Sequence, residues 1–169
     1  MRRPEKNEYA PFYEGYIKDV IGNDPFRNLE NQYQEIQSIL QSLTAEEANF
    51  AYSEGKWTVK EVLGHLIDTE RIMDYRALCI ARKEKQSLPG FEQDDYVREA
   101  NFKDINISNL LEDYRTVRKS TMSLFKNFTE NMLNQRGVAN GKEITVLALL
   151  YIIAGHEQHH LKILKEKYL

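Results

Sequence analysis

Residues 58–82 read TVKEVLGHLIDTERIMDYRALCIAR, a proline-free stretch in which apolar side chains recur every three or four positions. This spacing is typical of an amphipathic helix with one buried face. Thr58 and Glu61 form a T-x-x-E capping box, so the helix is predicted to run from Val59 to about Arg82. Trp57, directly before the cap, is interpreted as a hydrophobic staple. The buried face is expected to carry Val62, Leu63, Leu66, Met73, Ala77 and Ile80.

Three further long helices are expected from the same kind of pattern. The first begins at Pro25, where Asp24 can cap the opening turn. The next begins near Ser108, and the last is capped by Thr145 and runs to the C-terminus. The segments 85–107 and 128–143 are too polar or too rich in glycine and asparagine for core helices, so they are interpreted as connections.

The resulting prediction is an all-α four-helix bundle that forms one domain over residues 1–169. Residues 1–23 carry four aromatic side chains without a clear period. They are expected to form an N-terminal tail that packs on the bundle. A short helix is predicted inside the connection at residues 85–107, near residues 94–100.

Composition narrows the possible partners and location. The 169 residues are 41% hydrophobic and 29% charged, as in soluble globular proteins. The net charge of −3 gives no electrostatic reason to expect nucleic acid. No stretch resembles a membrane span or a signal peptide, so no membrane partner is expected. The single cysteine excludes an internal disulfide, and we expect a cytoplasmic protein.

The four histidines are concentrated on two of the predicted helices. His156 and His160 are four residues apart, which places them about 40° apart on a helical wheel and on the apolar face. His65 lies at the margin of its helix's apolar face, and His159 lies at the edge of the other or in solvent. Two inward histidines with a third on another helix indicate a metal site. Hydrogen-bonded core histidines are the alternative interpretation.

Three imidazole ligands would leave a coordination position open, as in catalytic rather than structural sites. Such a ligand set suits Zn²⁺, Ni²⁺ or Fe²⁺. Glu157 and Glu70 share the inward faces and are candidate catalytic residues, since either could orient a ligand histidine or accept a proton. The alternative for each is a position at the bundle edge that reaches solvent.

Two sequence motifs resemble a known family. KWTVKEVLGHLIDTER at residues 56–71 and IAGHEQHHLKIL at residues 153–164 are similar to the DinB/YfiT-like superfamily. The resemblance spans roughly residue 24 to the end. It implies an up-down-down-up bundle, often a homodimer, with a divalent metal bound by His65, His156 and His160.

The resemblance implies several possible activities on a small-molecule substrate. The leading hypothesis is an enzyme in which the metal ionises a low-molecular-weight thiol, making the protein a thiol-dependent S-transferase. The alternatives are a metal-dependent hydrolase and a non-catalytic metal-binding or stress-response bundle. The fold does not determine which of these reactions the protein catalyses. Measuring activity with and without an added thiol would distinguish the S-transferase from the hydrolase.

Overall fold

The computed structural model describes residues 1–169 and contains four long helices. They are α2 (Pro25–Leu40), α4 (Val59–Ala81), α6 (Ile107–Lys126) and α8 (Val146–Ile163). The short helices are α1 (Glu14–Asp19), α3 (Ala45–Ala48), α5 (Gln93–Ala100) and α7 (Glu130–Leu133). The α5 helix confirms the short helix expected near residues 94–100. A hairpin of β1 (Arg136–Ala139) and β2 (Lys142–Thr145) precedes α8.

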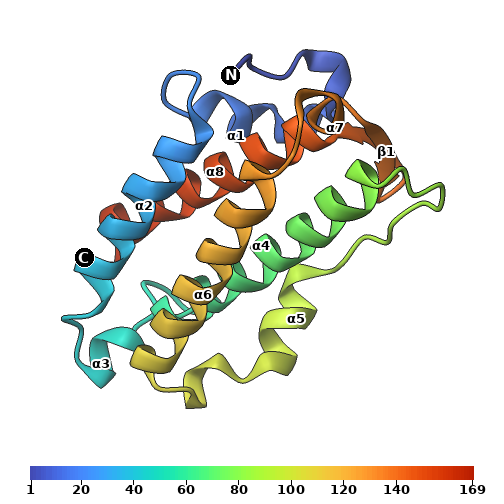
Figure 1. Cartoon of the computed structure of the whole chain (residues 1–169). Helices are drawn as coiled ribbons and strands as arrows, with labels where there is room; N and C mark the ends of the chain where they lie inside the picture. The colour runs from blue at the N-terminus through green and yellow to red at the C-terminus, as the bar shows by residue number, and fades with distance from the viewer.

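The four long helices form an up-down-down-up bundle. Figure 1 shows α2 and α8 running in one direction and α4 and α6 in the other. The α4 helix packs against both α6 and α8, and α2 contacts the same two helices from the opposite side. The predicted fold class is therefore confirmed. No helix combines the length and hydropathy that a membrane span requires.

Side-chain capping explains where three of the four long helices, α2, α4 and α8, begin. The Asp24 side chain accepts a hydrogen bond from the Arg27 amide, 3.0 Å away. The Thr58–Glu61 capping box is complete, because each side chain accepts a hydrogen bond from the other residue's amide. Thr145 accepts a hydrogen bond from the Ala148 amide at the start of α8. These caps satisfy amides that have no partner inside the first helical turn.

The interior consists of two apolar clusters separated by a polar layer. One cluster lies at the N-terminal half of α8 and the C-terminal half of α4, and the other lies at their opposite ends. Between them, each of three helices contributes buried polar side chains. These are His65, Thr69 and Glu70 on α4, Arg118 and Thr121 on α6, and His156 and Glu157 on α8.

The connection at residues 128–143 contains regular structure that the sequence analysis missed. It holds α7 and the antiparallel pair β1–β2, in which Arg136 faces Thr145 and Ala139 faces Lys142. The two turn residues, Asn140 and Gly141, have φ angles of 51° and 68°. An Asn-Gly pair with positive φ at both positions forms the tight turn that hairpins prefer, so the signal was present in the sequence.

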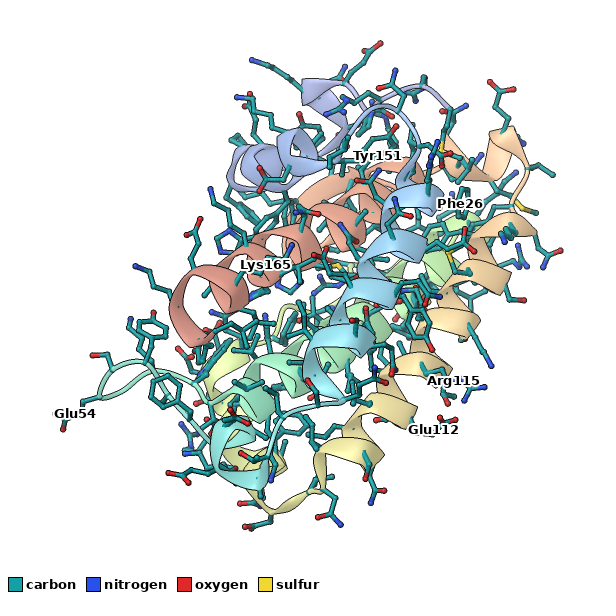
Figure 2. The ribbon with its side chains drawn as sticks, turned by 90° about the vertical axis from the view of Figure 1, so that its left-hand side faces the viewer. Phe26, Glu54, Glu112, Arg115, Tyr151 and Lys165 are labelled. Atoms are coloured by element: carbon teal, nitrogen blue, oxygen red, sulfur yellow. The ribbon has the colours of Figure 1, made fainter.

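The N-terminal segment packs closely along α8. Within it, α1 follows short 3₁₀ turns at Lys6–Glu8 and Pro11–Tyr13. The helices α1 and α8 approach at Gly155, where an added Cβ would lie 1.8 Å from the Tyr16 carbonyl oxygen. In contrast, the loop between α3 and α4 extends away from the helices, with Glu54 at its tip (Figure 2).

Candidate metal centre

Three histidine side chains converge between α4 and α8. The Nε2 atom of His156 lies 3.0 Å from Nε2 of His65 and 3.1 Å from Nε2 of His160. One ligand atom from each ring lies within 4.8 Å of the others. Two nitrogens bound at about 2.1 Å to one ion are separated by about 3.0–3.4 Å for angles between 90° and tetrahedral. The observed separations around His156 therefore suit a shared ion.

The helical framework explains how the three rings meet. His156 and His160 lie one turn apart on α8, on the same face. His65 comes from α4 and is only 3% exposed, although its helical periodicity placed it at the margin of the apolar face. The difference arises because α4 packs against both α6 and α8. Its buried face is therefore broader than its apolar stripe.

The protonation state of the cluster favours metal binding. Burial lowers the pKa of His65 to about 4. Burial and the neighbouring His65 and His159 rings lower the pKa of His160 to about 3. Burial, followed by the effect of the other histidines, also places the pKa of His156 well below its usual value. All three rings are neutral at physiological pH, which is the form that binds a metal ion.

The contacts around His156 fit a cation better than a proton. Its Nε2 atom faces two other Nε2 atoms at hydrogen-bond distance. A neutral ring carries at most one hydrogen on that nitrogen, so it can satisfy only one of the two contacts. An ion at this position would accept all three lone pairs. The donor set thus fits a divalent transition metal.

Aromatic and hydroxyl groups support the histidine rings. The Tyr16 ring lies edge-on to His156, with centroids 5.3 Å apart, and the Trp57 ring lies 4.8 Å from His65. The Thr69 hydroxyl is 3.4 Å from Nδ1 of His65, where it can help fix the ring orientation. Trp57 therefore contacts the site directly, in addition to its predicted position beside the helix cap.

The fourth histidine lies outside the cluster. His159 is half-buried, with its ring 5.6 Å from Tyr16 and 5.2 Å from His160. It does not share the point at which the other three converge. Its edge position agrees with the prediction from helical periodicity.

Glu70 and Glu157 are buried rather than solvated at the bundle edge, with exposures of 4% and 2%. Arg118 donates to both oxygens of Glu70, at 2.9 and 2.7 Å, and also to Glu157. The Tyr114 hydroxyl donates to Glu157 as well. Burial raises the pKa of Glu157 despite the attraction of Arg118. The hydrogen bonds of both carboxylates therefore go to α6 rather than to the histidines.

A small internal void connects these carboxylates with the histidine cluster. It has a volume of about 10 Å³, and Glu70, Glu157, His156 and Thr69 contribute to its wall. That volume is close to the space needed by one water molecule. Glu70 and Glu157 therefore lie behind His156, on the side away from bulk solvent.

A cleft of about 360 Å³ lies on the other side of the histidines. The α4 helix lines it with His65, Thr69, Met73 and Arg76, and α8 contributes His156. A larger groove of about 530 Å³ lies between α2 and α6, but no histidine lines it. The cleft of about 360 Å³ is therefore the candidate substrate site.

Other segments complete the walls of this cleft. Tyr13 and Tyr16 come from the N-terminal segment, and Phe91, Glu92 and Asp94 come from the connection after α4. Sequence reasoning did not identify these residues, because their position depends on how the two segments fold back on the bundle. Arg76 was detectable: it is eleven residues after His65, which returns a helix to within about 20° of the same face.

Comparisons with known proteins agree with this fold. A sequence profile described as the DinB superfamily matches residues 28–164. A protein of Oceanobacillus iheyensis named "putative metal-dependent hydrolase" is 26% identical over 151 residues, covering 88% of this chain and 85% of the relative.

Two solved structures share the fold. YfiT from Bacillus subtilis, described as a "probable metal-dependent hydrolase with an unusual four-helix bundle topology", matches with a TM-score of 0.74 and 18% identity, over 94% of this chain and 91% of that chain. A mycothiol-dependent maleylpyruvate isomerase matches with a TM-score of 0.65 and 11% identity, over 85% of this chain and 58% of that chain.

Proposed function

Because this chain belongs to the DinB superfamily and gathers three neutral histidines beside a cleft, we propose that it is a metal-dependent hydrolase of a small-molecule substrate. The convergence of the His65, His156 and His160 nitrogens carries this proposal. The names of the Oceanobacillus relative and of YfiT support it over the S-transferase expected from the sequence.

The proposed roles of the residues follow from their positions. His65, His156 and His160 would hold Zn²⁺, Ni²⁺ or Fe²⁺, which supplies Lewis-acid chemistry that lowers the pKa of water or a thiol toward neutrality. Glu92 and Asp94 line the cleft, so their carboxylates are on the side where a substrate could transfer a proton.

Glu70 and Glu157 are assigned a different role from Glu92 and Asp94, the carboxylates that could accept a proton from a substrate. Both lie behind His156, held by Arg118, and neither lines the cleft. We propose that they are positioning residues that tie α4 and α8 to Arg118 on α6 and thereby fix the two helices that carry the histidines. Their direct participation in catalysis stays a prediction.

Metal content and hydrolysis test the proposal together. Protein purified without a nickel column should contain about one zinc, nickel or iron per chain by elemental mass spectrometry. His156→Ala should lose the metal and all ester or amide cleavage. His159→Ala is the matched control, because His159 is on the same helix but outside the cluster, and it should keep both. Equal metal content in the two variants would contradict the assigned ligands.

A thiol-dependent transferase is the second candidate. The structural match to a protein named as mycothiol-dependent favours it, and a metal that lowers the pKa of water also lowers that of a thiol. Conjugation of a model electrophile that requires both the bound metal and an added low-molecular-weight thiol would favour this candidate. Cleavage that proceeds without thiol would favour the hydrolase. The homodimer implied by the family resemblance stays a prediction, for which sedimentation equilibrium is the test.

A further inference from the structure

Arg76 is a buried cation in the wall of the candidate substrate cleft. It is 3% exposed, and its Nη2 donates to the Pro89 carbonyl oxygen at 2.7 Å. Its Nη1 lies 3.6 Å from the Met73 sulfur, a weak acceptor. Arg76 also neighbours Tyr13. Burial raises the pKa of the Tyr13 hydroxyl, and the positive charge of Arg76 opposes this rise. All these partners are neutral.

Arg118, the buried arginine of the polar layer, shows what Arg76 lacks. Arg118 forms ion pairs with Glu70 and Glu157, all three at 4% exposure or less. Arg76 forms no ion pair with any carboxylate of the chain. A buried guanidinium is costly unless an anion balances it. Because Arg76 lines the cleft, its missing countercharge points to a ligand.

The position of Arg76 defines where that ligand's charge would lie. Arg76 and His65 are eleven residues apart on α4, which corresponds to about 16 Å between their Cα atoms and nearly the same helix face. Thr69 and Met73 lie between them along the cleft. The guanidinium reaches back to Met73, one turn closer to His65. The cleft therefore has the histidines at one end and a cation at the other.

We propose that this cleft binds a substrate that carries a carboxylate, recognised by Arg76, several bonds away from the group that reacts near the histidines. The identity of the reacting end rests on the proposed function, but the carboxylate subsite does not. A guanidinium fork matches the two oxygens of a carboxylate.

The charges around the cleft favour a carboxylate over a phosphate. Glu92 and Asp94 line the same cleft, and the whole chain has a net charge of −3. A dianionic phosphate would meet more repulsion there than a monoanion, with a single arginine to offset it.

One part of the remaining wall is aromatic and fits an apolar portion of the ligand, while Gln93 and Asn140 add polar groups. The Arg76 guanidinium lies 5.9 Å from the centroid of the Phe91 ring, and Tyr13 and Tyr16 face the cleft from the N-terminal segment. Aromatic surfaces of this kind contact planar or aliphatic groups. The proposed ligand is thus a carboxylate that also carries an apolar group.

The test compares two probes that share one carbon skeleton and end in a carboxylate or in a neutral hydroxyl group. Binding of 4-phenylbutanoate and of 4-phenylbutan-1-ol to the full chain is measured by isothermal titration calorimetry, with and without zinc. The carboxylate is expected to bind about 10- to 100-fold more tightly, as for a hydrogen bond to a charged group. The Nε–H signal of Arg76 in the nuclear magnetic resonance spectrum should shift only with the carboxylate. Equal binding of the two probes would overturn the proposal.

Two variants test whether the preference for the carboxylate depends on Arg76. Arg76→Met should remove the preference for the carboxylate, whereas Arg71→Met should keep it. Arg71 is on the same helix but pairs with Asp113 on the outside of the bundle. A preference that survives in Arg76→Met would overturn the proposal. If Arg76→Met does not fold, the Arg76 Nε–H shift in the unmodified protein decides whether Arg76 binds the carboxylate.

The result is independent of turnover. Neither probe has a reactive group, and the preference should persist in zinc-free protein and in His156→Ala. A carboxylate preference without any hydrolysis would therefore refute the proposed function alone. Hydrolysis without a carboxylate preference would refute the proposed subsite alone.

Discussion

Gly155→Ala tests whether the contact between α1 and α8 is as close as the structure shows. A Cβ at this position would lie 1.8 Å from the Tyr16 carbonyl oxygen and 2.4 Å from its carbon. Contacts below about 3.0 Å are not tolerated. The obstacle is backbone rather than a flexible side chain, so α1 must retreat by more than about 1 Å.

The expected magnitude follows from two opposing effects. Forcing extra volume into a well-packed contact costs about 1–3 kcal/mol. Replacing a helical glycine with alanine gains about 0.5–1 kcal/mol through helix propensity. Because the obstacle is backbone, the cost lies in the upper part of its range, about 2–3 kcal/mol, so the net loss in the free energy of unfolding is about 1–2.5 kcal/mol. For a protein of this size, that corresponds to a decrease of about 2–10 °C in the melting temperature.

Gly15→Ala is the matched control on the other side of the same contact. Gly15 is in α1, and a Cβ built on it meets no atom within 4 Å. Alanine there should stabilise the protein by up to about 1 kcal/mol. Urea unfolding of both variants and the parent supplies the measurement. Equal or greater stability of Gly155→Ala, with α1 still protected from proteolysis, would refute this account of the contact.

The same variant separates the cleft from the histidine cluster. The α1 helix supplies Tyr16 to the cleft, whereas all three clustered histidines come from α4 and α8. Gly155→Ala should therefore change the affinity for cleft ligands while leaving metal stoichiometry at the parent value.

Three further predictions concern ionisable side chains in the interior of the bundle. In metal-free protein, His65 and His160 have folded pKa values of about 4 and 3, below the value near 6.5 of the unfolded chain. The free energy of unfolding is therefore highest above pH 6.5 and falls as the pH decreases. The contribution of His65 to this loss is about 3 kcal/mol at pH 4. Urea unfolding measured across this pH range would show the loss, and a flat profile would contradict it. Burial raises the pKa of Asp74 to about 7, so Asp74→Asn should stabilise the protein by about 1–3 kcal/mol above pH 7 and by almost nothing near pH 4. Arg118→Met should cost about 3–5 kcal/mol, because it leaves two buried carboxylates unpaired, and the loss should be smaller at pH 5.5 than at pH 8.

The sequence predicted what depends on local interactions. Asp24, Thr58 and Thr145 cap helices as expected, because a cap needs only the next three residues. The pair His156 and His160 was found for the same reason, since one turn of helix brings them together. The direction of each helix came from the family resemblance rather than from periodicity.

Tertiary packing determined the features that the sequence analysis missed. His65 is buried because α4 has two helical neighbours, which periodicity along one helix does not show. Phe91 and Tyr16 reach the cleft only after their segments fold back. The Asn140-Gly141 turn is an exception: its signal was local, and the many polar residues around it obscured a short hairpin.

The two buried arginines, Arg118 and Arg76, differ in whether the chain itself supplies their countercharge. Arg118 and its partners are satisfied by one another, and apolar clusters on both sides supply the stability that such a layer requires. Arg76 has no carboxylate partner within the chain, and the His156 Nε2 atom can satisfy only one of its two contacts. Both border the same cleft. These two groups, on the wall of one cleft, are therefore the ones expected to be completed by ligands.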